Sequence, residues 1–394
     1  MNRPLLNRRL AGMGTTIFAE MSALAVETGA VNLGQGFPDT DGPRKIAQVA
    51  ADAVLAGRGN QYPPGPGVLE LRQAISWHQK HWYGLDYDPG AEILVTVGAT
   101  EAIAASLLAL VEPGDEVIAL EPYYDSYAAC IAMAGGVRVP VTLRPPGFRP
   151  DLDALRAAVT PRTRLILLNT PHNPTGCVFT GAELATVADI ARAHDLLVVT
   201  DEVYEHLVFE GEHVPIASLP GMRERTVAIS SAGKTFSFTG WKVGWVMASA
   251  GLVSAVRTAK QFLTFVASGP FQYAVAEALR LPDSYFIDLN DDLRRKRDLL
   301  CAGLAATGFE VYPPAGTYFV TTDIRSLGEQ DGLAFCRELP RRAGVVAVPS
   351  GVFYDDKEAG ASQVRFAFCK RVEVLEEAIS RLNSLRGSSP LGQP

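Results

Sequence analysis

Residues 164–204 read RLILLNTPHNPTGCVFTGAELATVADIARAHDLLVVTDEVY, and this stretch decides the fold class. Two runs rich in apolar residues, Arg164–Asn169 and Leu196–Thr200, predict buried strands. The segment between them predicts a helix over Gly181–His194, and the Thr-x-x-Glu spacing of a capping box marks its start. A strand, a helix and a second strand in this order predict two parallel strands joined by a crossover helix.

The same alternation extends to both sides of this unit. Short apolar runs predict further strands at Ile93–Val97, Glu116–Leu120, Thr226–Ser230 and Val243–Ala248. Helical patterns at Ala99–Val111 and Tyr127–Ala134 follow the first two of them. We therefore predict an α/β fold whose sheet is mostly parallel and covered by helices on both faces.

The pattern changes after about residue 285 and predicts a smaller α+β domain. The expected helices are Asp288–Thr307, Gly332–Leu339 and Val372–Leu385, and the expected strands are Gly316–Thr322, Val345–Val348 and Val364–Phe368. The tail Gly387–Pro394 is rich in Gly, Ser and Pro and is expected to be disordered.

Composition and charge narrow the classes of function. The 394 residues are 47% hydrophobic and 20% charged, with a net charge of −7 and no basic stripe, so a nucleic-acid partner is not expected. The longest apolar stretch, Ala102–Val111, is too short to cross a bilayer, and no signal peptide is expected. Five cysteines without a CxxC motif favour a reducing, cytoplasmic location and no metal centre.

Chemically active residues follow the predicted strands. In an open α/β sheet, ligands bind beyond the carboxyl ends of the strands, so these positions should meet at one edge. They supply a helix start suited to a phosphate, a stacking aromatic ring, an amide, a carboxylate, a phenol and two lysines. The segments are 98–100, 123–124, 169–176, 201–204, 231–234 and 239–242. This set suits pyridoxal phosphate, which needs a lysine for its aldehyde and an acidic partner for its ring nitrogen.

With these residues identified, the sequence resembles the fold-type I pyridoxal-phosphate aminotransferases of classes I and II. It is most similar to the kynurenine aminotransferase and glutamine transaminase K group and to actinobacterial N-succinyldiaminopimelate aminotransferases. The resemblance runs from about Phe18 to Leu385. It rests on NLGQGFPD, NQYPPGPG, TVGATEAI, EPYYDSY, NTPHNPTG, TDEVYEHLVF, SSAGKTFSFTGWKVGW, PAGTYF and VRFAFCK.

The resemblance implies a domain organisation. An N-terminal arm, residues 1–30, joins the small domain. Residues 31–285 form a large cofactor-binding domain with a mostly parallel seven-stranded sheet, and residues 286–394 form the small C-terminal domain.

The resemblance also implies roles at the cofactor ring. Lys234 is expected to bond the cofactor aldehyde and later to move a proton between the substrate Cα and the cofactor. Asp201 is expected to pair with the ring nitrogen and keep it protonated. Tyr204 and Asn173 correspond to residues that hydrogen-bond the 3-oxygen of the ring. Tyr124 corresponds to the residue that stacks on the ring, where close relatives commonly have Phe.

A second implied set binds the phosphate. It comprises the backbone of Gly98, Ala99 and Thr100 and the side chains of Ser231 and Lys242.

The last implied roles concern the second subunit and the substrate. Tyr62 is expected to reach the phosphate of the other subunit, which implies a homodimer with shared active sites. Arg365, Asn169 and the Gly36 backbone are expected to hold the substrate α-carboxylate.

Four features of the sequence allow another interpretation. Gly233-Lys234-Thr235 lacks the first glycine of a P-loop, because position 228 is Ala. His78 and His81 have HxxH spacing, but their polar neighbours favour a solvated helix face over a metal site. His172 could line the pocket or support its loop, and Arg365 could be a structural strand residue.

Other functions were also compared. A DNA-binding regulator that uses this fold as a sensor is nearly excluded, since only about 30 residues precede NLGQGFPD. β-Elimination from cysteine S-conjugates remains the alternative to transfer of an amino group from an L-amino acid to a 2-oxo acid. The expected side-chain pocket is apolar or aromatic, which suits aromatic, Met, Gln or kynurenine substrates. No second arginine is evident there for the distal carboxylate of N-succinyl-LL-diaminopimelate.

Overall fold

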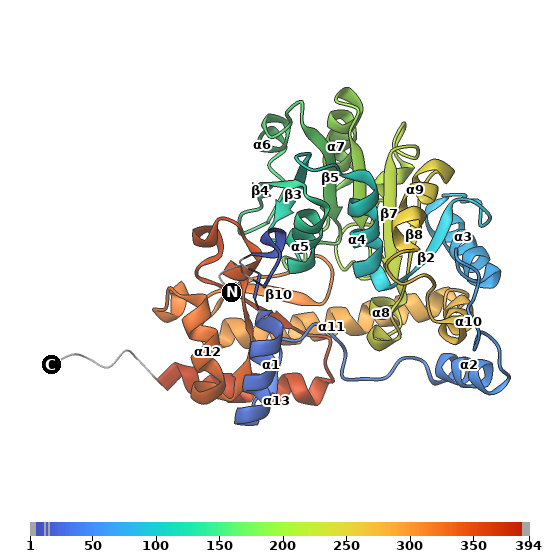
Figure 1. Cartoon of the computed structure of the whole chain (residues 1–394). Coiled ribbons are helices and arrows are strands. Elements are labelled where there is room, and N and C mark those ends of the chain that lie inside the picture. Colours follow the sequence, from blue (N-terminus) through green and yellow to red (C-terminus); the bar gives the residue numbers. More distant parts are fainter. Residues whose placement is uncertain (1–4, 12, 15, 388–394) are drawn as a thin grey trace.

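The computed structural model describes residues 5–11, 13–14 and 16–387, and its centre is a seven-stranded sheet (Figure 1). The strand order is β2-β8-β7-β6-β5-β3-β4. Strand β8 runs antiparallel to both of its neighbours, and the other pairs are parallel. The strands are β2 (Ile93–Val97), β3 (Glu116–Glu121), β4 (Val137–Thr142), β5 (Thr163–Asn169), β6 (Leu197–Asp201), β7 (Thr226–Ser231) and β8 (Val243–Met247).

Helices cover both faces of this sheet, because its strands are apolar on both sides. In β2, Leu94 belongs to one apolar core, whereas Ile93 and Val95 belong to another on the opposite face. One face carries α4 (Gly98–Leu110), α5 (Asp125–Ala134) and α9 (Ala250–Lys260). The other carries α3 (Leu69–Tyr83), α6 (Leu152–Ala157), α7 (Gly181–Ala193) and α10 (Gly269–Ala278), with α2 (Arg44–Leu55) packed on α10.

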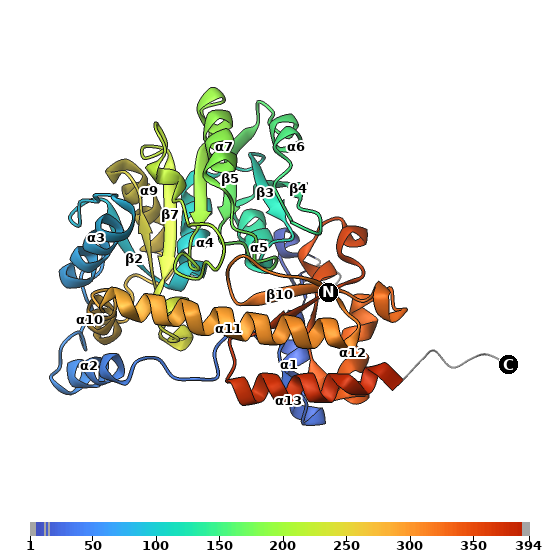
Figure 2. The same cartoon turned by 180° about the vertical axis from the view of Figure 1, so that it is seen from behind.

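The C-terminal part is built on a four-stranded antiparallel sheet of order β12-β13-β10-β9. Its strands are β9 (Glu310–Tyr312), β10 (Phe319–Asp323), β12 (Val348–Pro349) and β13 (Gln363–Ala367). Helices α12 (Gly332–Ala343) and α13 (Val372–Leu382) share one apolar core with it. The long helix α11 (Asp283–Thr307) runs from beneath the large sheet to this core (Figure 2).

The N-terminal helix α1 (Ile17–Thr28) lies with these C-terminal elements rather than with the large sheet (Figure 1). Glu20 pairs with Arg337 and Glu27 pairs with Arg341. Strand β1 (Val31–Asn32) then pairs in parallel with β11 (Val345–Val346). The exact three-part division of the chain stays a prediction.

The predicted fold class is confirmed, and the differences have local causes. Strand β4 was not predicted, because it lies at the sheet edge and contains Pro140. The strand predicted from Gly316 begins only at Phe319, since Thr317 has a φ of 68° and turns the chain. The predicted Val345–Val348 strand is two short ones, β11 and β12, and α13 ends at Leu382.

Two further sequence predictions concern the start of α11 and the C-terminal tail. Helix α11 starts at Asp283, five residues before the predicted start. Residues 388–394 of the predicted disordered tail lie outside the described residues. Within the described part of the chain, no helix combines the length and apolarity that a membrane-spanning helix needs.

Candidate active site

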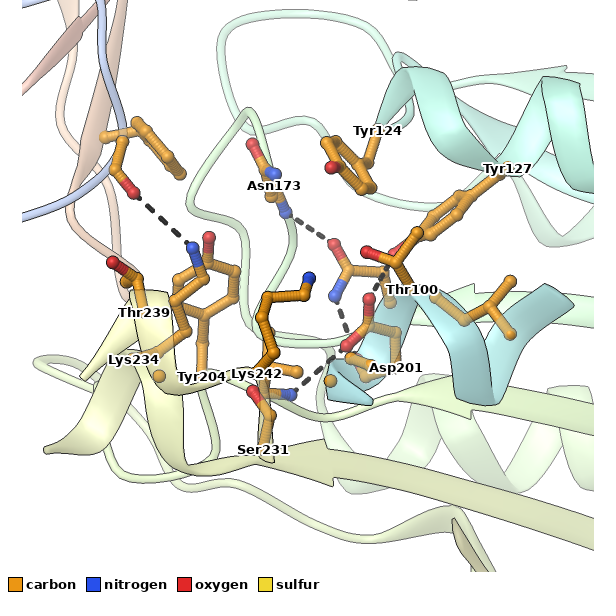
Figure 3. A pocket seen from close by; sticks show the side chains of 18 of the residues that line it. Thr100, Tyr124, Tyr127, Asn173, Asp201, Tyr204, Ser231, Lys234, Thr239 and Lys242 are labelled. Atoms are coloured by element: carbon orange, nitrogen blue, oxygen red, sulfur yellow. Dashed lines mark hydrogen bonds between the residues drawn. The ribbon is translucent and has the colours of Figure 1, made fainter. Parts of the chain in front are cut away.

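A cavity of about 330 Å³ lies at the carboxyl edge of the large sheet and is closed on one side by the C-terminal part. Thirteen of the predicted site residues line it: Gly36, Gly98, Ala99, Thr100, Tyr124, Asn169, Asn173, Asp201, Tyr204, Ser231, Lys234, Lys242 and Arg365. Figure 3 shows most of the polar ones converging from separate strands. They meet because β5, β6 and β7 are parallel neighbours, which places the residues after each strand side by side.

One end of the cavity is suited to an anion. Gly98 has a φ of 73° and turns the chain from β2 into α4, whose first N–H groups have no partner within the helix. Lys242 is itself held at a φ of 54°, and its Nζ would lie 3.1 Å from a Cβ placed on Gly98. Gly244 has no room for a side chain, because a Cβ there would lie 2.5 Å from the Gly98 carbonyl carbon. The N-terminus of α4 therefore presents N–H groups to the same space as the Lys242 ammonium.

At the end of β6, Asp201 offers a buried carboxylate. Tyr127 donates a hydrogen bond of 2.7 Å to its Oδ2, and the Val203 N–H donates one of 3.3 Å to its Oδ1. Burial raises the pKa of Asp201 to about 6, against the effect of these hydrogen bonds. The Asn169 amide donates to the Asp201 backbone carbonyl at 2.8 Å and accepts from the Asn173 N–H at 2.7 Å, which fixes the neighbouring loop.

Lys234 stands on the short helix α8 (Ala232–Thr235) that follows β7. Its Nζ lies 3.4 Å from the Gly36 carbonyl oxygen and faces the rings of Tyr204 and Tyr318 at 5.8 and 5.6 Å. Burial lowers the pKa of Lys234 to about 8, so a larger share of it is a neutral amine near neutral pH. A neutral amine in a cavity can attack an aldehyde.

Arg365 enters the cavity from β13, in the C-terminal sheet. It donates hydrogen bonds to Asn173 Oδ1 at 3.0 Å and to the Gly34 carbonyl at 3.2 Å, and its guanidinium lies 4.0 Å from the centre of the Phe319 ring. Burial lowers the pKa of Arg365 to about 10. Within the described chain its Nε has no hydrogen-bond partner, and the carboxylate that acts on its charge is that of Asp125. A buried guanidinium of this kind is suited to bind a carboxylate in two-pronged geometry.

Tyr62 is the predicted residue that does not line the cavity. It is 81% exposed, and its ring contacts that of Phe265 at 5.3 Å.

Sequence reasoning missed several residues at the site. Tyr127 and Phe319 line the cavity, and Tyr318 donates a hydrogen bond of 2.6 Å to the Gly36 carbonyl. Thr239, from the predicted segment 239–242, lines the cavity as well. Tyr127 follows Tyr124, the N-cap of α5, by three residues, and this helical spacing could have indicated that the two rings lie together.

The HxxH segment on α3 is only partly as predicted. His81 is partly exposed and pairs with Asp283, but His78 is buried, so the predicted solvated face is wrong for His78. His78 Nδ1 lies 3.1 Å from the Leu279 carbonyl, and His78 Nε2 lies 2.7 Å from His206 Nε2. Although Glu205 is near enough to join them as a metal ligand, the 2.7 Å separation is that of a hydrogen bond. Two ligand nitrogens of one zinc ion would stand about 3.3 Å apart, given bonds of about 2 Å and tetrahedral angles.

His172 does not line the cavity. It is buried, and its Nδ1 lies 2.8 Å from Thr175 Oγ1, so it supports the loop that carries Asn173.

Comparisons with known proteins agree with this geometry. The family model "Aminotransferase class I and II" matches residues 28–382. A Mycobacterium tuberculosis protein named as a probable N-succinyldiaminopimelate aminotransferase is 55% identical, over 96% of this chain and 98% of its own length. The methionine aminotransferase of Escherichia coli is 42% identical, over 98% of this chain and 100% of its own. A solved structure of N-succinyldiaminopimelate aminotransferase from M. tuberculosis has a TM-score of 0.94 and 55% identity, covering 96% of this chain and all of the other.

Proposed function

From the premise that the chain belongs to the class I and II aminotransferases, a family that uses pyridoxal phosphate, we propose that this cavity holds that cofactor. The observation that carries the proposal is that Lys234, Asp201 and the anion-binding turn line one cavity together. The donors present fit the group: a buried amine for its aldehyde, a buried carboxylate for its ring nitrogen and a cradle for its phosphate.

Each end of the cofactor has protein groups to bind it. The N–H groups of Ala99 and Thr100, with the side chains of Ser231 and Lys242, would hold the phosphate. Asp201 would hold the ring nitrogen in its protonated form.

Polar and aromatic groups are also present for the ring itself. Tyr124 would stack on it, and Tyr204 and Asn173 would hydrogen-bond its 3-oxygen. When bound, the cofactor draws electron density away from the substrate Cα and so makes its proton acidic.

The chain's own residues then orient the substrate and move the proton. Arg365, with Asn169 and the Gly36 backbone, holds the α-carboxylate, which fixes the direction of the Cα–H bond. Lys234 would become a free amine once the substrate amine had replaced it at the cofactor aldehyde. It could then take the proton from Cα and return it on the cofactor side. Phe18 and Phe319 line the substrate end of the cavity and keep water from it.

We infer N-succinyl-LL-diaminopimelate as the first candidate for the amino donor, supported by the 55% identity to the M. tuberculosis protein. One observation favours a second candidate, methionine or an aromatic amino acid. Phe18 and Phe319 are apolar, and the cations lining the cavity are assigned to the cofactor or the α-carboxylate. The same deprotonation would serve β-elimination if the substrate carried a leaving group on Cβ.

A homodimer with shared active sites completes the proposal. Tyr62 and Phe265 form an exposed aromatic pair, and Phe262 beside them is 83% exposed. Large exposed aromatic side chains are enriched where a second protein binds. We propose that a second copy covers them and that Tyr62 reaches its phosphate site, with the whole enzyme in the cytoplasm.

A half-reaction assay tests the reaction. Purified holoenzyme is mixed with single L-amino acids and N-succinyl-LL-diaminopimelate, without an oxo acid, and the cofactor absorbance is followed. We expect loss of the yellow aldehyde form with a true donor and its return when 2-oxoglutarate is added. A protein that released pyruvate from cysteine S-conjugates, while no amino donor bleached it, would be a C–S lyase instead.

Hybrid dimers test the shared site. Inactive Lys234→Ala chains are mixed with Tyr62→Ala chains under conditions that exchange subunits. One intact site per hybrid should restore part of the activity. No recovery, after exchange has been demonstrated, would mean that each site is built from one chain.

A further inference from the structure

The hydroxyl of Tyr127 donates a hydrogen bond to Asp201, and no role has yet been assigned to Tyr127. Tyr127 lies on α5, is 3% exposed and donates its hydrogen bond to Asp201 across the cavity floor (Figure 3). At 2.7 Å this is the shorter of the two hydrogen bonds that the Asp201 carboxylate accepts among the described residues. It also engages the oxygen that the Val203 N–H does not reach.

A carboxylate buried to this degree loses its hydration, and this loss favours the neutral acid. A neutral donor can offset the loss only if it keeps its own proton. Tyr127 does so, because burial and the neighbouring Asp201 raise its pKa well above the ordinary value. The hydrogen bond therefore favours the ionised form of Asp201. The other titratable groups that face this carboxylate are Lys234, Glu202, Tyr204 and Tyr124.

The bond also sets the orientation of the carboxylate. Asp201 has a single side-chain carbon between its backbone and its carboxyl group, so little rotation remains once Oδ2 is bonded. The Tyr127 ring is fixed in turn by its edge contact with Tyr124 at 5.8 Å. Tyr124, the N-cap of α5, and Tyr127 in its first turn thus line the cavity together.

We propose that Tyr127 is a positioning residue that keeps Asp201 ionised and oriented toward the ring nitrogen of the cofactor. The inference rests on the proposed function and adds a residue to it. Without Tyr127 the carboxylate becomes a stronger base, and the proton that it shares with the ring nitrogen moves toward Asp201. The ring then loses its positive charge and draws electrons less strongly from the substrate Cα.

Binding to the apoprotein separates this role from a structural one. Wild type and Tyr127→Phe are titrated with pyridoxal phosphate and with the analogue whose ring nitrogen is replaced by C–H. Tyr127→Phe should weaken binding of pyridoxal phosphate about tenfold and leave binding of the analogue within about twofold. An equal loss for both cofactors would mean that Tyr127 only supports the fold, and no loss for either would also overturn the inference.

A matched control is available four residues before Tyr127, just ahead of α5. Tyr123 is also buried and hydrogen-bonds a carboxylate, Asp355, outside the cavity. Tyr123→Phe removes the same kind of contact, so it should show no difference between the two cofactors.

The spectrum of the holoenzyme gives a second readout. Loss of the ring charge favours the protonated, yellow form of the Lys234–cofactor linkage, so its pH midpoint should rise by about one unit in Tyr127→Phe. Placing 3-fluorotyrosine at position 127, a stronger donor of nearly the same shape, should lower that midpoint, and this arm holds even if Tyr127→Phe folds poorly. Midpoints that do not move in opposite directions would contradict the inference. If wild-type apoprotein failed to bind pyridoxal phosphate, the proposed function would fail together with it.

Discussion

Residues 201–206, at the end of β6 and just after it, contribute to two groups of buried titratable residues. The two groups differ in whether their polar atoms still lack hydrogen-bond partners. Asp201 and Tyr204 face the cavity. Among the described residues, Lys234 makes one long hydrogen bond there, and the Nε of Arg365 has no partner. Glu205 and His206 face the other way, into a closed cluster with His78 and Gln79.

We call the second group the His78 cluster; it consists of His78, Gln79, Glu205 and His206. Its polar side chains form hydrogen bonds with one another and with neighbouring buried groups. Both ring nitrogens of His78 have partners, and Glu205 accepts from Ser230 at 2.6 Å and from Gln79 at 3.2 Å. Burial lowers the pKa of His78 to about 4 and raises that of Glu205. Perturbed pKa values are thus common to both groups, and what distinguishes the site is open space beside polar groups that lack partners.

The comparison predicts that substitutions in the cavity remove activity and largely spare stability. The largest effect is expected for Lys234→Ala, which removes the attacking amine and the proton carrier together. Turnover should fall by about 10³-fold or more. The melting temperature of the apoprotein should change little, because the Lys234 ammonium makes a single hydrogen bond, at 3.4 Å, within the described chain.

Chemical labelling identifies the lysine directly. Borohydride reduction of the wild-type holoenzyme should attach the cofactor to the Lys234 peptide. A label on Lys242 or on the buried Lys260 would overturn the assignment.

Asp201→Asn should have the next largest effect. The amide cannot balance positive charge on the ring nitrogen, so the transition state loses its main electrostatic support, and kcat should fall about 10²- to 10³-fold. Cofactor binding should weaken less, because the phosphate contacts remain. Steady-state kinetics with a measured cofactor content checks this, and turnover close to wild type would contradict the role of Asp201.

Arg365→Ala should act mainly on substrate binding. Both the amino donor and the oxo acid present a carboxylate, so the KM of both should rise about 100-fold. A suitable control is Arg325→Ala, since Arg325 lies in the same C-terminal part but is exposed and paired with Asp323. If KM rose for only one of the two substrates, Arg365 would not be the common carboxylate site.

The topology of the sheets explains which parts of this site could be predicted from the sequence. Residues after β5, β6 and β7 were predicted to meet, because parallel neighbours bring their carboxyl ends to one edge. Arg365 comes from a separate sheet, so only its motif indicated it. Tyr62 lies outside the cavity of a single chain, and the role proposed for it requires a second subunit.

The prediction of a solvated helix face at His78 was wrong, and this also has a physical cause. Trp77, Gln79 and Lys80 make the sequence around His78 look like a solvated helix face. His78 is buried because Phe286 at the start of α11 and His206 cover it, at ring distances of 5.5 and 4.9 Å. Both lie more than 100 residues further along the chain, so no local pattern reports them.

The smallest effect on activity, and a clear effect on stability, is expected for His78→Asn. The substitution breaks the His78–His206 hydrogen bond and should lower the free energy of unfolding by about 1–3 kcal/mol at pH 7, with kcat within about twofold of wild type.

The pH dependence follows from the lowered pKa of His78. An unfolded histidine gains its proton near pH 6.5, but the folded one does so only near pH 4, so between these values the unfolded state binds more protons. His78 therefore makes stability fall as the pH falls through this window, by about 1.4 kcal/mol per pH unit. The raised pKa values of Asp201 and Glu205 act in the opposite direction over part of this range, so the quantity to compare is the slope of wild type minus that of the variant. Urea unfolding at pH 5 and pH 7 measures it, and His81→Asn on the exposed side of the same helix is the control. A slope that His78→Asn leaves unchanged, or a loss of turnover as large as that of Asp201→Asn, would show that the His78 cluster is not the closed structural counterpart of the cavity.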